Sequence, residues 1–285
     1  MKAQLIDGKL ISAEIKAEAA EEAAALKEKG IEPCLAVVLV GDNAASKVYV
    51  SNKEKACAAV GIRSVSHVLP ETTTEEELLK LIDELNADQS VHGILVQMPV
   101  PKHIDDRKVI MAISPDKDVD CFHPVNVGYL HIGAKGFLPC TPAGIIELIK
   151  RSGYSIAGKN CVVIGRSNIV GKPVAMLLMQ ENGTVTICHS KTKDLAGICR
   201  GADIIVSATG KVNTVTADMV KEGAIIIDVG MNRNAEGKLC GDVDFENVKE
   251  VAGAITPVPG GVGPMTIAML MKNCNTAARI QNGLI

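Results

Sequence analysis

The sequence predicts an α/β fold made of two β/α domains, the second of them a Rossmann-like dinucleotide-binding domain. Short apolar runs that suit buried strands alternate with amphipathic stretches that suit helices, which is typical of parallel sheets covered by helices. The alternation occurs in two series, separated by a stretch between residues 102 and 141 that prolines punctuate. The chain of 285 residues is also at the size where single hydrophobic cores begin to divide.

The first series opens with a helix rich in Ala, Glu and Lys, expected over residues 9–29, because Gly30 and Pro33 end it. Three buried strands and two helices follow, and together they predict a parallel sheet. The strands are expected at 35–40, 63–68 and 91–96, and the helices at 46–60, where Ser46 is the expected cap, and at 74–86.

Between the two series the periodic pattern weakens, and we expect a linker that forms part of a site, followed by a helix at 143–152. The second series has strands expected at 161–165, 184–188, 203–208 and 224–229, and the chain ends in a helix. We place the domain boundaries at 1–141 and 142–263, with the C-terminal helix, 264–285, packing back on the first domain.

Composition argues against several classes of partner. A formal net charge of −3 and a pI of about 6.1 lack the basic stripe that binds phosphates, so we expect no nucleic-acid partner. The N-terminus has no apolar core of a signal peptide, and no apolar run approaches the roughly 18 residues of a membrane span. We therefore expect a cytoplasmic protein with no membrane partner. The nine cysteines are scattered and form no Cys-x-x-Cys pair, which predicts reduced thiols and no metal site.

A candidate phosphate-binding loop follows the strand expected at 161–165. Gly165, Arg166 and Ser167 form a tight turn, and Gly171 lies at the start of a helix, the layout that receives a pyrophosphate on backbone N–H groups. The spacing departs from Gly-x-Gly-x-x-Gly because Ser167 stands in place of the second glycine, so an ordinary strand-to-helix turn is the alternative. A P-loop is excluded, because five residues separate Gly165 from Gly171 where a P-loop has four.

The end of the next strand points to NADP. NAD-binding members of this fold place an acidic residue there to accept a hydrogen bond from the ribose hydroxyl. Here no acid occurs before Asp194, whereas Ser190, Lys191, Lys193 and Arg166 could donate to a 2′-phosphate. A solvated basic strand end is the alternative interpretation.

A candidate chemical centre lies in the first series. Tyr49 and Lys53 are four residues apart, so they share one helix face, although such pairs also occur by chance on packing or surface faces. Gln97 follows a strand and puts an amide at the carboxyl edge of the sheet, where α/β folds place ligands; a solvated Gln is the alternative.

Two further segments carry candidate ligand contacts. The acidic run Asp116, Asp118 and Asp120 is not an EF-hand, because Cys121 stands where that loop needs Gly. It is either a solvated loop or the source of a carboxylate that holds a polar heterocycle. The segment 257–266 places three glycines between prolines just before a helix, which lets backbone approach a ligand closely.

In their order along the chain, these segments resemble the bifunctional methylenetetrahydrofolate dehydrogenase/cyclohydrolase family over essentially the whole sequence. The resemblance implies oxidation of 5,10-methylenetetrahydrofolate to the methenyl cation with NADP, then hydrolysis to 10-formyltetrahydrofolate. It also implies a folate-binding first domain, an NADP-binding second domain, an active-site cleft between them, no metal, and a homodimer. The resemblance is carried by residues 49–57, 60–62, 96–99, 115–120, 139–142, 165–171 and 257–266.

By the same resemblance, Lys53 is the catalytic residue, Gln97 its hydrogen-bonded partner, Tyr49 packs on the folate and Asp120 holds the pterin. The catalytic set is therefore Tyr49, Lys53, Gln97 and Asp120, and substrate binding adds Val96, Met98, Pro259, Gly260, Gly261, Val262 and Gly263. The implied cofactor contacts are Gly165, Arg166, Ser167, Ser190, Met231 and Thr266.

The sequence departs from the family pattern beside Asp120. Cys121 stands where Gly is usual, and Tyr129 where Arg is common. If the position requires a positive φ, a Cys there costs about 1 kcal/mol or more and could tilt Asp120.

Two other functions are compatible with the domain pattern: an NADP-dependent dehydrogenase of a small carboxylic or amino acid, and a nucleotide-sensing protein without catalysis.

Overall fold

The computed structural model describes residues 3–134 and 136–285 and divides the chain into two compact units. The first, here the three-stranded unit, comprises Glu14–Cys140 and Ile267–Ile285. The second, the six-stranded unit, comprises the residues up to Ala13 and Thr141–Thr266. Each contains a parallel sheet with helices packed on it, which confirms the predicted α/β class with two β/α parts.

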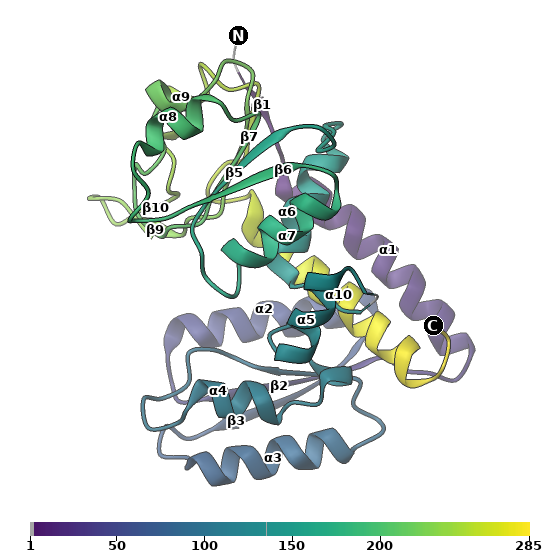
Figure 1. The fold of residues 1–285 in the computed structure, drawn as a ribbon. Coiled ribbons are helices and arrows are strands. Elements are labelled where there is room, and N and C mark those ends of the chain that lie inside the picture. The colour runs from purple at the N-terminus through teal and green to yellow at the C-terminus, as the bar shows by residue number, and fades with distance from the viewer. Residues whose placement is uncertain (1–2, 135) are drawn as a thin grey trace. The chain divides into compact units, whose positions relative to one another are not determined.

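The three-stranded unit is built on the strand order β3-β2-β4, with all strands parallel. Every residue of the central strand β2 is buried, as its continuous apolar sequence predicts. Helix α2 lies on one face of this sheet, and α3 and α4 lie on the other (Figure 1). The bounds are β2 (Cys34–Val40), β3 (Arg63–Leu69), β4 (Gly93–Val96), α2 (Ala44–Val60), α3 (Glu75–Ala87) and α4 (Asp106–Ala112).

Local capping explains where these helices begin. The side chains of Thr74 and Glu77 form a capping box at α3, each accepting a hydrogen bond from the other's backbone N–H. Helix α2 begins after Asn43, whose side chain accepts a hydrogen bond from the Ser46 N–H at 3.1 Å. The expected Ser46 cap was therefore wrong by one turn, because Asn43 also accepts well at an N-cap and lies before two alanines that extend the helix.

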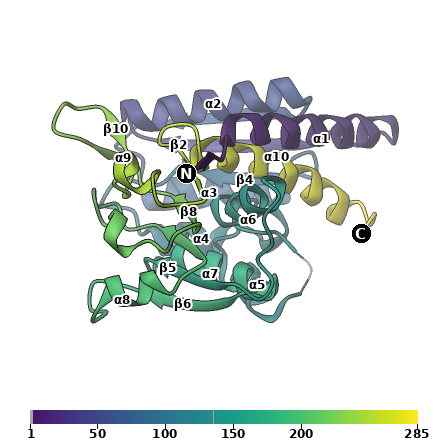
Figure 2. The same ribbon diagram turned by 90° about the horizontal axis from the view of Figure 1, so that it is seen from above.

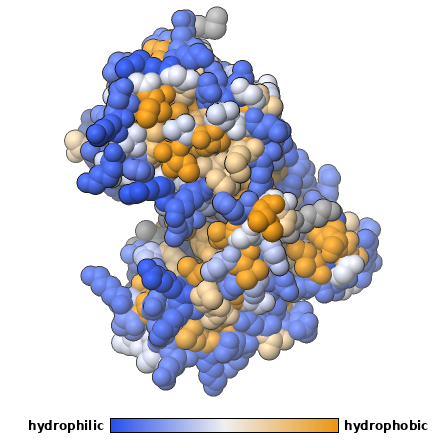
Figure 3. Space-filling view, viewed as in Figure 1, coloured by the Kyte–Doolittle hydropathy of each residue, from blue (hydrophilic) through white to orange (hydrophobic). Residues whose placement is uncertain are grey.

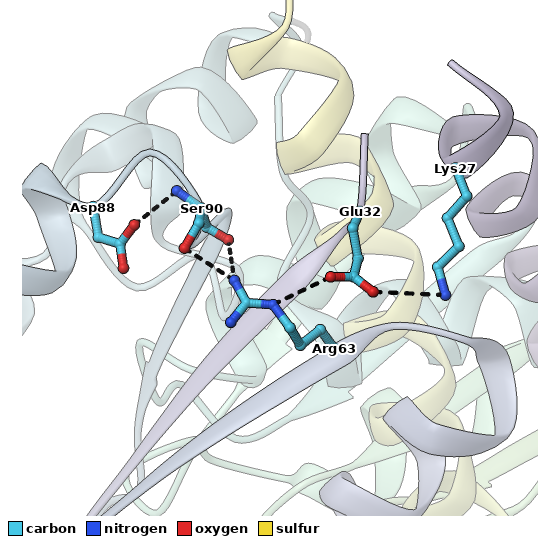
Figure 4. Close-up of polar contacts among 5 residues, drawn as sticks. All are labelled: Lys27, Glu32, Arg63, Asp88 and Ser90. Atoms are coloured by element: carbon cyan, nitrogen blue, oxygen red, sulfur yellow. Dashed lines mark hydrogen bonds and ion pairs between the residues drawn. The ribbon is translucent and has the colours of Figure 1, made fainter. Parts of the chain in front are cut away.

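The amino edge of this sheet is tied by a chain of polar contacts (Figure 4). The Arg63 guanidinium, at the start of β3, donates to the Ser90 carbonyl at 2.8 Å and lies 3.5 Å from the Glu32 carboxylate. Lys27 pairs with Glu32 at 4.0 Å, and Asp88 accepts from the Ser90 N–H at 2.8 Å. These groups are mostly exposed, so each pair contributes little stability. Their location leaves the opposite, carboxyl edge for ligands.

The stretch expected to be a site-forming linker contains two short helices and a 3-10 turn. Besides α4, it holds η1 (Pro115–Lys117) and α5 (Pro124–Ile132). Proline stands at the start of η1 and of α5. A proline at a helix start needs no N–H partner, so these residues begin helices and do not interrupt them. The weakened pattern thus did not predict the short helices of this stretch.

Two long helices complete the three-stranded unit. From Glu14 onwards α1 (Gly8–Glu28), and from Ile267 onwards α10 (Val262–Gln281), belong to it and run side by side in Figures 1 and 2. The Asn275 amide on α10 donates to the Ala19 carbonyl on α1 at 2.8 Å. The expected terminal helix is confirmed.

The six-stranded unit has the strand order β1-β11-β8-β7-β5-β6, again parallel. The four strands β5, β6, β7 and β8 match the predicted second series closely, and the two-residue strands β1 and β11 were not predicted. The bounds are β1 (Gln4–Leu5), β5 (Asn160–Ile164), β6 (Thr184–Cys188), β7 (Ile204–Ser207), β8 (Ile225–Asp228) and β11 (Ala254–Ile255). The remaining elements are the pair β9 (Asn232–Arg233) and β10 (Leu239–Cys240), with α6 (Cys140–Arg151), α7 (Gly171–Gln180), α8 (Leu195–Arg200), η2 (Ala217–Met219) and α9 (Phe245–Val248).

The surface of each unit in Figure 3 is mostly hydrophilic, with apolar groups in separate patches. This agrees with a sequence that is 47% hydrophobic and places most of its aliphatic side chains in the cores. Among the helices of the described residues, none is both long and apolar enough to cross a membrane.

Candidate functional site

Lys53 and Gln97 meet at the carboxyl edge of the three-stranded sheet. Lys53 lies on α2 and is 9% exposed, and Gln97 directly follows β4. The Lys53 Nζ donates a hydrogen bond to Gln97 Oε1 at 2.9 Å, while the Gln97 amide donates to the Met98 carbonyl at 2.9 Å. The second bond orients the amide so that its oxygen faces the lysine. Tyr49 lies one turn before Lys53 on α2 and is 39% exposed, so its ring can contact a ligand.

Asp120 lies close enough to Lys53 for their charges to interact. Burial raises the pKa of the Asp120 carboxyl, the Lys53 charge lowers it, and the Asp118 carboxylate raises it further. The Cys140 thiol lies 3.9 Å from Asp120 Oδ1 and donates to it. The structure therefore brings Lys53, Gln97 and Asp120 into one polar cluster.

The acidic run that contains Asp120 is held by its neighbours and is not a solvated loop. Asp118 is 2% exposed, and its carboxylate accepts from the His123 N–H at 2.8 Å and from the Asn126 amide at 2.9 Å. Lys117 is 5% exposed and donates to the carbonyls of Leu85 at 2.9 Å and Asp88 at 2.7 Å. Burial lowers the pKa of Lys117. These contacts orient the run so that Asp120 comes next to Lys53.

Cys121 adopts the conformation that favours glycine. Its φ is +61°, in the left-handed region, and the residue is 1% exposed. The Cys121 thiol donates to the Phe137 carbonyl at 3.2 Å, and its N–H donates to the Asp118 carbonyl at 3.1 Å. The backbone therefore adopts a positive φ with a Cys side chain, and these hydrogen bonds hold the turn that follows Asp120.

In the six-stranded unit, the candidate phosphate loop needs both of its glycines. Gly165 has a φ of +130°, and a Cβ there would lie 2.4 Å from the Ala208 carbonyl oxygen. A Cβ on Gly171 would lie 2.4 Å from the Gly165 carbonyl oxygen. Between them, the Ser167 hydroxyl accepts from the N–H groups of Val170 and Gly171 at 3.2 and 3.3 Å. Ser167 thus stabilises the turn in place of the missing second glycine.

A cavity of about 650 Å³ opens beside this loop at the carboxyl ends of β5, β6 and β7. Arg166 and Ser190, the candidate donors to a 2′-phosphate, line it together with Lys211, which was not among the predicted residues. Asp194, the first acid after β6, accepts from the Gly197 N–H at 3.0 Å and caps α8. The cavity, here the basic cavity, therefore combines cationic donors with a glycine turn. It is lined by Ile164, Gly165, Arg166, His189, Ser190, Leu195, Ala208, Thr209, Lys211, Asn213 and Thr214.

A second cavity of about 480 Å³ in the same unit, here the glycine-wall cavity, gathers the segment 257–264. The predicted folate-wall residues Pro259 to Gly263 line it, and so do two predicted cofactor residues, Met231 and Thr266. The Thr266 hydroxyl shares a hydrogen bond of 2.8 Å with the Thr141 hydroxyl. Lys9 and Asp228 also line this cavity, and no motif in the sequence indicated them.

The predicted residues thus fall into three groups. The polar cluster holds Lys53, Gln97 and Asp120, with Val96 buried in β4 beside Gln97. The basic cavity holds Gly165, Arg166 and Ser190, and the glycine-wall cavity holds Met231 and Thr266 with residues 259–263. Within residues 3–134 and 136–285, no group of three or more His, Cys, Asp and Glu side chains is arranged to hold a metal ion.

Comparison with known proteins gives consistent matches along the chain. A family model described as the tetrahydrofolate dehydrogenase/cyclohydrolase catalytic domain matches residues 6–120, and one described as the NAD(P)-binding domain of the same family matches residues 139–282. The bifunctional protein FolD of Agathobacter rectalis is 64% identical over 277 residues, which cover 97% of this chain and 99% of that protein.

Solved structures agree. The bifunctional FolD of Campylobacter jejuni has a TM-score of 0.95 at 54% identity, covering 98% of this chain and 99% of that one. The Trypanosoma brucei methylenetetrahydrofolate dehydrogenase-cyclohydrolase, solved with NADP cofactor and an inhibitor, has a TM-score of 0.92 at 43% identity and covers 98% of each chain.

Proposed function

The chain belongs to the tetrahydrofolate dehydrogenase/cyclohydrolase family, and we propose that Lys53, Gln97 and Asp120 form the folate-side centre of its two reactions. The enzyme oxidises 5,10-methylenetetrahydrofolate to 5,10-methenyltetrahydrofolate with NADP and hydrolyses the product to 10-formyltetrahydrofolate. The observation that carries the site assignment is the hydrogen bond of 2.9 Å between the lysine and the glutamine, next to the partly buried Asp120 carboxylate.

Residues of the six-stranded unit fit a dinucleotide. Gly165 and Gly171 leave room where a Cβ would collide with backbone, so N–H groups can approach a pyrophosphate closely. Arg166, Ser190 and Lys211 line the basic cavity, and we assign Arg166 and Ser190 to the 2′-phosphate that distinguishes NADP from NAD. NADP supplies the hydride acceptor for the dehydrogenase step. We assign Ser167, Met231 and Thr266 to the same cofactor.

For hydrolysis, the chemistry requires proton transfer at the one-carbon bridge of the substrate. Water adds to the methenyl carbon and loses one proton, which gives a neutral hydroxyl adduct. The hydroxyl then loses its remaining proton as the formyl C=O forms, and the bond from that carbon to N5 breaks as N5 receives a proton, so that one proton is released overall. Lys53 can give and take a proton, and Gln97 holds its Nζ with a neutral amide. We assign Asp120 to a hydrogen bond with the pterin ring. We assign Tyr49, Val96, Met98 and residues 259–263 to the walls that surround the folate.

The test separates the two reactions. Wild-type enzyme given methylenetetrahydrofolate and NADP should form NADPH and the methenyl product, which absorbance can follow together. Replacement of the proton-transfer group, Lys53→Met, should lower cyclohydrolase kcat by about 10²- to 10⁴-fold, while hydride transfer, which depends mainly on juxtaposition, falls less. Lys53→Arg should fail in the same way, because arginine keeps the charge but does not release a proton. Near-wild-type hydrolysis by either variant would contradict the assignment.

We also propose that the enzyme acts as a homodimer in the cytoplasm, without a nucleic-acid partner, and that its 10-formyltetrahydrofolate serves purine biosynthesis. The net charge of −3 supports the absence of a nucleic-acid partner. Sedimentation equilibrium tests the dimer, since a single species of about twice the 30.0 kDa chain mass is expected.

A further inference from the structure

A buried carboxylate in the six-stranded unit lies underneath the basic cavity without lining it. Asp242 follows β10 and is fully buried, at 0% exposure. Its two oxygens accept six hydrogen bonds from neutral donors. Oδ2 accepts from the Ser207 hydroxyl at 3.1 Å, the Thr209 N–H at 2.6 Å, the Thr209 hydroxyl at 2.9 Å and the Gly210 N–H at 3.2 Å. Oδ1 accepts from the Lys211 N–H at 3.0 Å and the Asn232 amide at 2.9 Å.

Four of these six bonds come from one exposed turn. Residues 209–211 follow β7 and are exposed, and Thr209 and Lys211 line the basic cavity. A solvent-exposed turn has few buried contacts of its own to order it. Asp242, 31 to 33 residues away in sequence, gives the turn's three consecutive N–H groups one common acceptor group. The carboxylate therefore joins the backbone of this cavity wall to the interior of the unit.

A second buried acid links Asp242 to the glycine-wall cavity. Asp228 ends β8, is 3% exposed and lines that cavity with Gly230. Its carboxylate accepts from the N–H groups of Asp242 at 2.9 Å, Val243 at 3.0 Å and Gly230 at 2.9 Å. A Cβ on Gly241 would lie 1.8 Å from Asp228 Oδ2, and one on Gly230 would lie 2.2 Å from Asp242 Oδ1. The two acids thus pack against glycines and connect the walls of both cavities.

We propose that Asp242 is a positioning residue for the cofactor: it holds the turn at residues 209–211 in the shape that receives the dinucleotide, and Asp228 holds Asp242. This inference rests on the proposed NADP site in the basic cavity. Asp242 acts through the turn and does not touch the cofactor itself.

The decisive variant is Asp242→Asn, which keeps the shape and removes one acceptor oxygen. In either orientation, the new NH₂ group faces N–H or O–H donors, because both oxygens of Asp242 accept in the native protein. We expect the Kd for NADP, measured by isothermal titration calorimetry, to rise at least tenfold. KM for NADP should rise in parallel, with dehydrogenase kcat at saturating NADP within threefold of wild type. Cyclohydrolase activity on the methenyl substrate, measured without NADP, should stay within twofold.

A matched control lies two positions along the chain. Asp244→Asn removes the same charge from a side chain that accepts from the Asn247 amide at 2.7 Å and lines neither cavity. Its Kd for NADP should stay within twofold of wild type. A second variant, Ser207→Ala, removes one donor to Asp242 from a buried residue and leaves the carboxylate intact. It should raise the Kd two- to fivefold, and it decides the question alone if Asp242→Asn does not fold.

The outcomes separate this inference from the proposed function. A wild-type enzyme that binds no NADP would overturn the cofactor assignment itself. If the wild type binds NADP, an Asp242→Asn variant with an unchanged Kd overturns the positioning role, as does a proportional loss of NADP binding and cyclohydrolase activity. If Asp242→Asn does not fold, a folded Ser207→Ala variant with an unchanged Kd for NADP overturns the positioning role.

Discussion

Asn273 on α10 offers a direct test of how the site carboxylate Asp120 is positioned. Asn273 is 5% exposed, and its amide donates to the carbonyls of Val119 and Leu138, each at 2.8 Å. The first of these carbonyls belongs to the residue before Asp120. Asn273→Ala removes this donor from the buried Val119 carbonyl and from the carbonyl of the exposed Leu138, and a buried unsatisfied group costs about 1–3 kcal/mol. The variant should therefore lose about 1–3 kcal/mol of unfolding free energy.

Asn275, two residues further along the same helix, provides the matched control. It is fully buried and donates to the Ala19 carbonyl at 2.8 Å, and its own Oδ1 has no hydrogen-bond partner among the described residues. Asn275→Ala removes a donor and an unsatisfied acceptor together, so the two effects offset each other and the loss should be about 1 kcal/mol or less. Its contacts are with α1 and do not involve Asp120.

The assay combines stability with ligand affinity. Urea unfolding gives the free energies, with equal m values required for the comparison. Asn273→Ala should also weaken binding of a tetrahydrofolate analogue by about tenfold, equivalent to about 1.4 kcal/mol, because the backbone before Asp120 relaxes. Asn275→Ala should leave that affinity unchanged. Equal folate affinities for the two variants would refute the argument that Asn273 positions Asp120, whatever their stabilities.

Three further predictions address the remaining site residues. Arg166→Ala should reduce the preference for NADP over NAD by about ten- to a hundredfold, since a charge-assisted contact contributes about 1.5–3 kcal/mol; an unchanged ratio of kcat/KM values would contradict this. Asp120→Ala should weaken folate binding and spare NADP binding, whereas Cys121→Gly should keep folate affinity within about threefold, because the backbone at Cys121 already has a φ of +61°. Burial raises the pKa of Asp228 from 3.8 to about 6, so the native protein binds the proton more tightly than the unfolded chain. As pH rises between these two values, the unfolding free energy of the wild type should therefore fall by up to about 3 kcal/mol relative to that of Asp228→Asn. A difference in unfolding free energy that does not change with pH would contradict this prediction.

The elements that the sequence predicted well are those in which the order of apolar and polar residues directly indicates which residues are buried. Strand β2 is buried along its whole length, and α3 carries a capping box and an apolar stripe, so local residues alone indicate both. The short elements were missed for a physical reason. Helices α4 and α5 span 7 and 9 residues, too few turns for a clear period, and the two-residue strands β1 and β11 exist only because they pair with each other and with β8.

The candidate site was likewise predictable only where local sequence carries the information. Motif order identified Lys53, Gln97 and Asp120, and the family resemblance supplied their roles. The hydrogen bond that joins Lys53 to Gln97 spans 44 residues, and spacing alone does not predict it. Roles for these residues stay predictions until the variants above are measured. Lys211 was not predicted as a site residue, because an exposed lysine after a Gly has no local sequence pattern that indicates ligand binding.

Asp228 and Asp242 show which feature of the sequence could have indicated a buried carboxylate. In a sequence, an acid beside glycines suggests a solvated turn, and neither residue was selected as a site. In the structure both are buried, because closely approaching backbone N–H groups replace water around the carboxylates. Such approach requires neighbours without a Cβ, and Gly230 and Gly241 satisfy this requirement. A pair of Asp residues that each lie within two positions of a glycine, one of them at the end of a buried strand, therefore indicates a carboxylate held by backbone. Here that arrangement orders loops at the carboxyl edge of a parallel sheet, which is where α/β folds place ligands.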